Sequence, residues 1–372
     1  MKAIGIILAG GNNDGRLGVL TEQRASAALP IGSCYRAIDF TLSNMSSSGI
    51  GKVAVLTQYN SRSLRDHLTS SKWWDFGRKQ GGLFVFTPYT SSKGSDWFRG
   101  TADSIYQNMP YLLRSNADYV VITSGDSVYK MDYREVVRYH VEKGADITVV
   151  YQNMENKDLR HFGILQMDTE NRLLGFEEKP QQAQSSCASL GVYVISRTLL
   201  ISLLQEVVPQ GEYGLVKDII IPYSQKLKIY GYAFDGYWNT ISTGIADYFQ
   251  INMDFLKKDV RDVFVNQYPY IDTKPKDEPP AKYNAGADVR DSIVGSGTIF
   301  NGTMEHCVVF RKVYTAENSV VKNSILMEGV RIGQNCLVEN AILDKDVEIS
   351  DGQQVVGKSE KEPIILKKGT KL

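Results

Sequence analysis

The C-terminal part of the chain contains an internal repeat, and this repeat constrains the fold more than any other feature. The segment Val289-Arg-Asp-Ser-Ile-Val294 recurs with starts at Met304, Val321 and Val338, at intervals of 15, 17 and 17 residues. Small residues occupy one equivalent position of each unit, at Ser292, Cys307, Ser324 and Ala341. A period of this length, with Ile and Val filling the interior, is typical of the coils of a parallel β-helix. We therefore interpret Cys307 as a small core residue and not as a nucleophile.

Composition excludes several functional classes. The 42 basic and 42 acidic residues cancel, so no long-range field favours a nucleic acid or an anionic membrane. The four cysteines form no Cys-x-x-Cys pair, which argues against a disulfide framework and a zinc site. No stretch approaches the roughly 18 apolar residues of a membrane span, and Ile4–Ala9 is too short and too early for a signal peptide. We expect a cytoplasmic protein that acts on small molecules.

The N-terminal part alternates apolar runs with polar helical stretches. The runs Ala3–Ala9, Lys52–Thr57 and Ala117–Thr123 predict strands, and a helical stretch precedes the second and the third of them. Strand, helix, strand in this order predicts a mostly parallel, Rossmann-like sheet. We expect an α/β domain over residues 1–244 and a β-helix over residues 286–372. Between them, the segment 245–285 is expected to form a helix from Ile245 to Val265 and then a Pro-rich linker.

Three predicted strands end in segments suited to ligand binding. Gly10-Gly11, Gln58 and Ser124-Gly125-Asp126 each follow a strand, and in open parallel sheets ligands bind beyond these carboxyl ends. A glycine turn lets main-chain N–H groups approach an anion, and Arg16 just beyond it can neutralise the charge. The two glycines considered alone are also compatible with a turn that has only a structural role and binds no phosphate.

Longer motifs make the assignment more specific. The chain resembles the ADP-glucose pyrophosphorylases (glucose-1-phosphate adenylyltransferases) of bacterial glycogen and plant starch synthesis. The motifs that carry the resemblance follow the same order along the chain: Leu8-Ala-Gly-Gly11, Tyr35-Arg-x-Ile-Asp-Phe40, Leu56-Thr-Gln-Tyr59, Arg99-Gly-Thr-Ala-Asp103, Gly125-Asp126, Phe176-Glu-Glu-Lys-Pro180, Ala188-Ser-Leu-Gly-Val-Tyr193 and Gly236-Tyr-Trp238.

The resemblance implies a nucleotidyltransferase domain followed by a left-handed β-helix, and a tetramer with effectors bound near the domain junction. It also implies a reaction in which glucose-1-phosphate attacks the α-phosphorus of ATP beside a magnesium ion. By position, three groups of residues would serve these ligands: Gly10, Gly11 and Arg16 the triphosphate; Gln58, Gly100 and Thr101 the adenosine; and Gly163, Glu178, Lys179 and Ser189 the sugar phosphate. Asp126 would hold the metal.

Two of these residues also have simpler interpretations. Asp126 could cap a turn, and Lys179, which is followed by Pro180, could be an ordinary surface lysine. The place of each residue in its motif favours the metal for Asp126 and the phosphate for Lys179.

The chain departs from the family pattern at the reaction centre. Its glycine turn, Gly10-Gly-Asn-Asn-Asp-Gly-Arg16, is one residue longer than the family's and places Asp14 beside a site for polyphosphate. Ser26 stands where the family has a lysine, and Thr240 stands where it has the second metal carboxylate. Hard cations are held largely by charged oxygens, so we expect magnesium binding to be weak or absent.

In these substitutions the chain resembles the D-type, regulatory-like subunit of the two-subunit enzyme found in some Gram-positive bacteria. The first hypothesis is therefore a catalytically impaired partner that joins a competent adenylyltransferase subunit in a heterotetramer. The second is an active adenylyltransferase with a rearranged metal site, supported by Asp126, Arg16 and Lys179. The third and least favoured hypothesis is that the β-helix is an acyltransferase, as hexapeptide repeats often are. His306 is the only histidine in that part of the chain, and no loop insertion surrounds it to form a pocket.

Overall fold

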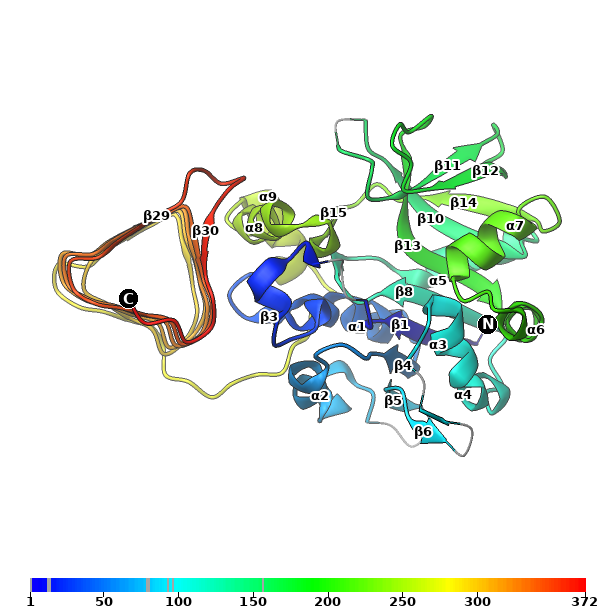
Figure 1. The fold of residues 1–372 in the computed structure, drawn as a ribbon, viewed down its shortest axis with the longest axis horizontal. Helices are drawn as coiled ribbons and strands as arrows, with labels where there is room; N and C mark the ends of the chain where they lie inside the picture. The colour runs from blue at the N-terminus through cyan, green and yellow to red at the C-terminus, as the bar shows by residue number, and fades with distance from the viewer. Residues whose placement is uncertain (1, 12–14, 78–80, 92–93, 96, 156) are drawn as a thin grey trace.

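The computed structural model describes residues 2–11, 15–77, 81–91, 94–95, 97–155 and 157–372. Figure 1 shows an α/β part on one side and a triangular β-helix, seen end-on, on the other. Both predicted components of the fold, the mostly parallel α/β sheet and the left-handed β-helix, are confirmed.

Within the part of the chain that the structure describes, the main sheet has nine strands. They are β1 (Ala3–Leu8), β4 (Lys52–Leu56), β5 (Gly82–Phe86), β8 (Tyr119–Ser124), β10 (Ile147–Asn153), β11 (Gly163–Met167), β12 (Leu173–Glu178), β13 (Cys187–Ser196) and β14 (Ile229–Ala233). The order β12-β11-β13-β8-β1-β4-β5 is parallel from β8 through β5, whereas β13 and β11 join antiparallel. β10 pairs with β13 and β14.

Helices cover both faces of this sheet, as expected for a sheet whose strands are apolar on both sides. The helices are α1 (Ala37–Ser47), α2 (Arg62–Leu68), α3 (Thr101–Gln107), α4 (Met109–Leu113), α5 (Tyr133–Glu142), α6 (Arg197–Val207) and α7 (Ile221–Tyr223). Alternate residues of β1 point to opposite faces of the sheet. Ile7 packs with α1, α2 and α5 on one face, while Ile4 and Ile6 pack with α3, α4 and α6 on the other.

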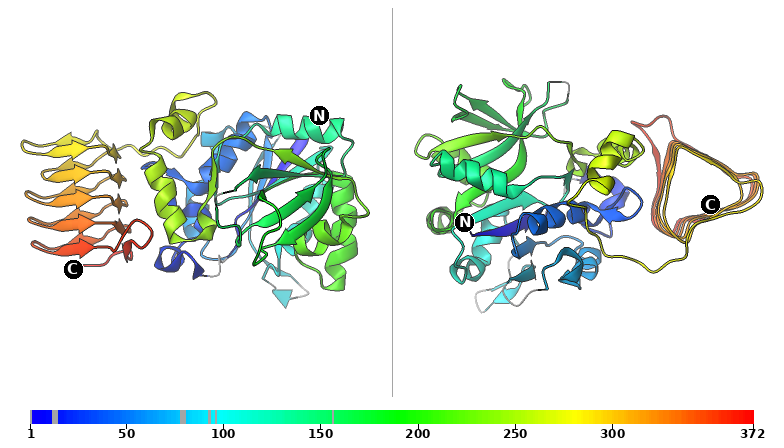
Figure 2. Two further views of the ribbon diagram at one scale, coloured as in Figure 1. Left: turned by 90° about the horizontal axis from the view of Figure 1, so that it is seen from above. Right: turned by 180° about the vertical axis from the view of Figure 1, so that it is seen from behind.

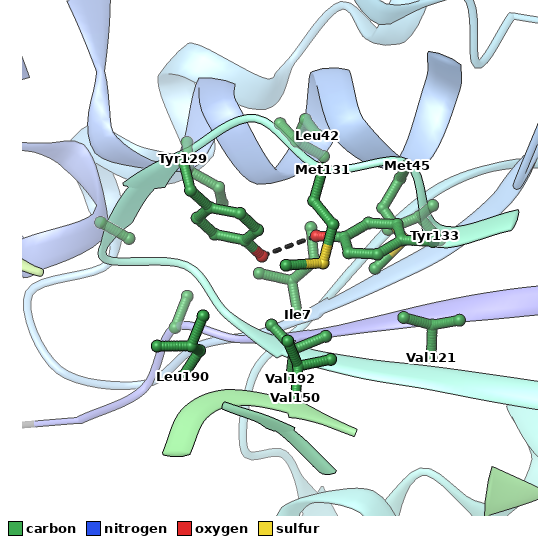
Figure 3. Close-up of a cluster of buried hydrophobic side chains, with 14 of the residues drawn as sticks. Ile7, Leu42, Met45, Val121, Tyr129, Met131, Tyr133, Val150, Leu190 and Val192 are labelled. Carbon is green, nitrogen blue, oxygen red and sulfur yellow. Dashed lines mark hydrogen bonds between the residues drawn. The ribbon is translucent and has the colours of Figure 1, made fainter. Parts of the chain in front are cut away.

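The core under α1 holds two tyrosines as well as aliphatic side chains. The hydroxyl groups of Tyr129 and Tyr133 lie 2.6 Å apart in a hydrogen bond between completely buried rings, with Ile7, Leu42 and Met45 around them (Figure 3). The paired hydroxyls satisfy each other, which lets two large polar aromatics pack in the interior.

The helix expected from Ile245 to Val265 is not continuous. The structure has α8 (Ile245–Asp254), α9 (Lys258–Arg261) and a short π-helix over Asp262–Asn266. The break occurs because Lys257 has extended backbone, with ψ at 130°. Periodic apolar residues alone therefore overestimated the length of this helix.

The repeat folds as predicted into stacked coils, which Figure 2 shows from the side. Three parallel five-stranded sheets form the faces of the triangle. Their strands are β16 (Lys282–Tyr283), β17 (Asp288–Arg290), β18 (Ile293–Val294), β19 (Ile299–Phe300), β20 (Thr303–Glu305), β21 (Val308–Val309), β22 (Tyr314–Thr315), β23 (Val320–Lys322), β24 (Ile325–Leu326), β25 (Arg331–Ile332), β26 (Leu337–Glu339), β27 (Ala341–Leu343), β28 (Glu348–Ile349), β29 (Gln354–Val356) and β30 (Ile364–Leu366). Cys307 is completely buried, which confirms its interpretation as a core residue.

An apolar layer joins the two parts of the molecule. Phe249 and Ile251 of α8 belong to the same cluster as Val308, Ile325 and Ile342, which lie on one face of the β-helix. The β-helix therefore packs directly on the α/β part. Within the described residues, no helix has the length and apolar character needed to cross a bilayer.

Candidate functional site

Three strand ends meet at one edge of the main sheet, as the sequence predicted. Leu8 at the end of β1 is in register with Ser124 of β8 and with Leu56 of β4. Beyond the strands, Gly125 N donates to Leu8 O at 3.0 Å and Ala9 N donates to Leu56 O at 2.8 Å. These bonds continue the sheet into the turns and hold the turn residues together.

Two adjoining cavities open at this edge. The larger, of about 400 Å³, is lined by every residue that the resemblance assigns to the nucleotide: Gly10, Gly11, Arg16, Gln58, Gly100 and Thr101. The smaller, of about 260 Å³, is lined by every residue assigned to the sugar phosphate: Gly163, Glu178, Lys179 and Ser189. Asp126 and Lys179 line both cavities.

On the nucleotide side, main-chain contacts fix the wall. The Gln58 amide donates to Phe98 O at 3.2 Å and accepts from Phe98 N at 2.9 Å, so part of its bonding capacity serves the fold. Gly100 lies so close to the chain at Tyr213 that an added Cβ would be 2.3 Å from the Tyr213 carbonyl oxygen. Only glycine permits this approach without movement.

On the sugar-phosphate side, Lys179 has an uncommon backbone. Its φ is +50°, a left-handed conformation that few non-glycine residues adopt, and its N–H donates to Phe162 O at 3.0 Å. The Lys179 Nζ lies 3.7 Å from a Glu178 carboxylate oxygen. Burial raises the pKa of Glu178, and the nearby lysine partly opposes that shift. A lysine and a carboxyl group are thus presented together at the end of β12.

Asp126 lies between the two cavities, where strand β8 gives way to β9 (Ser127–Tyr129). Its Oδ1 accepts a hydrogen bond from the Ser124 hydroxyl at 2.5 Å. Burial raises the pKa of Asp126, while the Ser124 hydroxyl and the positive charge of Arg16 favour its ionised form.

The two substituted positions also line the cavities, Ser26 the larger and Thr240 the smaller. Thr240, in β15 (Trp238–Thr240), is 4% exposed, and its hydroxyl donates to the main-chain oxygen of Asp126 at 3.2 Å. Its Oγ1 also accepts from Ser242 N at 3.3 Å. The hydroxyl is therefore engaged with the local main chain. Asp14 of the lengthened turn lies outside the described residues.

These residues do not fit a resident magnesium site of the kind that the resemblance implies. Magnesium takes oxygen ligands with near-octahedral geometry and usually one or two carboxylates. Here the carboxylate of Asp126 is in place, but the second position holds the neutral, hydrogen-bonded Thr240. In the ranges that the structure describes, no group of three or more His, Cys, Asp or Glu residues is arranged to hold a metal ion.

One residue of the site, His161, belongs to no motif that the sequence analysis could recognise. His161 lines both cavities, and its Nδ1 lies 3.3 Å from Nη1 of Arg16. The residue stands in a loop before β11, and a single histidine without a motif predicts nothing about its neighbours. Only the tertiary structure brings this loop beside Arg16.

A third cavity, of about 250 Å³, lies between the α/β part, the linker and the β-helix. Its lining includes five basic side chains, namely Arg36, Lys274, Lys276, Arg311 and Lys345. Glu328 pairs with two of them, at 2.7 Å from Arg311 Nε and 2.9 Å from Lys345 Nζ, and it lines the same cavity. The junction is therefore rich in positive charge.

Comparison with known proteins agrees with this architecture. The family model described as nucleotidyl transferase matches residues 4–258, and the GlmU-like C-terminal hexapeptide model matches residues 279–363. Among curated relatives, the glucose-1-phosphate adenylyltransferase of Geobacillus stearothermophilus is 37% identical over 325 residues, covering 86% of this chain and 83% of the relative. The enzyme of the same name from Thermosipho africanus is 39% identical over 323 residues, covering 86% and 78%. That of Clostridium perfringens SM101 is 36% identical over 328 residues, covering 87% and 84%.

Proposed function

The chain belongs to the glucose-1-phosphate adenylyltransferase (ADP-glucose pyrophosphorylase) family, and from that premise we propose that it is a catalytically impaired subunit of such an enzyme. It acts in glycogen biosynthesis in the cytoplasm as the regulatory partner of a competent subunit within a heterotetramer. In this proposal residues 1–244 hold the ligands, residues 245–285 connect the domains and contribute the first strand, β16, and residues 286–372 form the rest of the β-helix.

Retention of ligand binding is supported by the two adjoining cavities. Gly10, Gly11 and Arg16 line the larger cavity, and Lys179 lines both cavities. Together they offer main-chain N–H groups and two cations to the phosphates of ATP, glucose-1-phosphate or ADP-glucose. Gln58, Gly100 and Thr101 form the wall against which an adenosine group would lie.

One observation supports the proposal that catalysis is impaired. The Thr240 hydroxyl donates a hydrogen bond to the main-chain oxygen of Asp126. A neutral hydroxyl used in this way does not replace a carboxylate as a magnesium ligand. Losing half of a metal clamp lowers a phosphoryl-transfer rate by at least ~10²-fold, and the absence of a lysine at Ser26 lowers it further. We propose that Mg²⁺ binding by this chain is weak or absent.

The regulatory role is supported by the basic cavity at the domain junction. Arg36, Lys276 and Arg311 would attract small anionic effectors, and the cavity is bordered by both domains. A ligand there contacts the two parts at once, so it can favour one arrangement of the domains over another. The effect would reach the partner through the subunit interface.

The second candidate is an active adenylyltransferase with a rearranged metal site. It is favoured by the positions of Asp126, Arg16 and Lys179, all of which line the larger cavity as an active enzyme requires. It needs a substitute for the carboxylate absent at Thr240.

The test is ADP-glucose synthesis from ATP and glucose-1-phosphate by the purified chain, alone and mixed with the catalytic subunit of the same organism. We expect negligible synthesis alone and a changed rate or effector response in the mixture. Calorimetric titration with ADP-glucose measures binding separately from turnover. Rates typical of the family from the chain alone would reject the impaired subunit and support the second candidate.

A further inference from the structure

His161 faces Arg16 where the two ligand cavities meet. Nδ1 of the imidazole lies 3.3 Å from Nη1 of the guanidinium, across 145 residues of sequence, and both residues line the larger cavity. His161 also lines the smaller cavity, as Lys179 does. An anion at this junction would therefore lie within reach of three nitrogen-bearing side chains from three separate segments of the chain.

The main chain around His161 is firmly held, although the imidazole itself is exposed. The next residue, Phe162, is 8% exposed, and its ring lies 5.9 Å from that of Trp238. Phe162 N donates to Leu159 O at 3.0 Å, and Phe162 O accepts from Lys179 N at 3.0 Å. The imidazole is thus presented to the cavities from an anchored position.

The charged groups around the imidazole come from several segments. Arg16 of the glycine turn and Lys179 at the end of β12 are cationic, whereas Asp126 and Glu178 are acidic. On the histidine's own loop, Asp158 is paired with Arg160 at 2.6 Å. The imidazole therefore lies beside a guanidinium, and an anion bound between the two side chains would interact favourably with both of them.

We propose that His161 is a phosphate-contacting residue of this site, which takes up a proton when an anionic ligand binds between it and Arg16. The ligand is the pyrophosphate group of a nucleotide or nucleotide sugar, so this inference rests on the proposed function. The imidazolium supplies a positive charge in the same cavity that lacks the lysine at Ser26. Binding consequently strengthens as the pH falls through the range in which histidine titrates, around pH 6.5.

The experiment is calorimetric titration of the full chain with ADP-glucose at about pH 8, 7 and 6, repeated at pH 7 in buffers of different ionisation enthalpy. ADP-glucose is chosen because its pyrophosphate diester does not change charge across this range. For the unmodified chain we expect binding at least about fivefold tighter at the lowest pH than at the highest, with proton uptake on binding.

Three variants separate the contributions. His161→Gln keeps a hydrogen-bonding side chain without the titration, so its affinity should vary less than about twofold with pH. His161→Lys carries a permanent cation and should bind tightly at every pH. His306→Gln, a change at an exposed histidine of the β-helix, is the matched control and should behave as the unmodified chain does.

The possible outcomes distinguish a failure of the role of His161 from a failure of the proposed function. An affinity independent of pH in the unmodified chain, or a pH dependence that persists in His161→Gln, would overturn the role of His161 while leaving ligand binding intact. No binding of ADP-glucose by any variant at any pH would overturn the proposed ligand and this inference with it.

Discussion

The guanidinium of Arg24 forms an ion pair with the carboxylate of Asp344, in which the single nitrogen Nη2 lies 2.7 Å from both carboxylate oxygens. Arg24 is 5% exposed and Asp344 1% exposed, and the two residues are 320 positions apart. Arg24 precedes Ser26 in the loop that lines the larger cavity, while Asp344 directly follows β27. The pair thus joins a loop of the candidate site to the β-helix.

Breaking this pair should destabilise the protein strongly. In Asp344→Asn the buried guanidinium keeps its charge and loses its partner, which typically costs about 3–5 kcal/mol. Urea unfolding of the full chain measures the change. Asp288→Asn, which breaks the exposed pair with Arg290, is the control and should cost less than about 1 kcal/mol. Equal effects of the two substitutions would show that the buried pair does not stabilise the domain junction.

Restoring the missing groups should restore turnover. We expect the double variant Thr240→Asp with Ser26→Lys to synthesise ADP-glucose at least ~10²-fold faster than the unmodified chain, because it regains a metal carboxylate and a cation. Thr243→Asp introduces the same charge at a neighbouring residue and should give no gain. If the double variant binds ADP-glucose normally and stays inactive, the two substitutions do not explain the impairment.

Gly100 should not tolerate a side chain. The Cβ of Gly100→Ala would lie 2.3 Å from the Tyr213 carbonyl oxygen, so one of the two segments must move, at a typical cost of about 1–3 kcal/mol. Because Gly100 lines the larger cavity, ADP-glucose affinity should also fall. Gly77→Ala is the control, since nothing lies within 4 Å of its Cβ. Thermal unfolding and calorimetric titration of both variants provide the comparison.

His140 should make stability depend on pH. Burial lowers its pKa to about 4, and its Nδ1 lies 2.9 Å from the Thr148 hydroxyl. Since histidine in an unfolded chain titrates near about 6.5, the unfolded state binds the proton first, and stability present above that pH is lost as the pH falls toward about 4. When the pH is lowered from about 7 to about 5, His140 should reduce the free energy of unfolding by about 2 kcal/mol.

The measurement for His140 is urea unfolding at these two pH values for the unmodified chain and for His140→Gln. Other groups that titrate in this range affect both proteins alike, so the comparison isolates the histidine. A loss of stability that is equally large in the variant would contradict the prediction.

The sequence by itself determined the elements and the edge at which the site forms. The apolar runs that became β1, β4 and β8 are continuous because both faces of a parallel sheet are buried, and the residues after them must meet at one edge. The repeat likewise fixed the coils, because each unit can bury its apolar side chains only against its neighbours. The placement of Gly10, Gln58 and Asp126 around one cavity follows from these local rules.

Only the tertiary structure decided how distant segments combine. It interrupted the helix expected over 245–265 at Lys257, where extended backbone separates α8 from α9. It engaged the Thr240 hydroxyl with the main chain, and it brought His161 to Arg16 and Arg24 to Asp344. Such pairs depend on the relative positions of loops and domains, which are set by the packing of surfaces far apart in the chain and leave no periodic trace in the sequence.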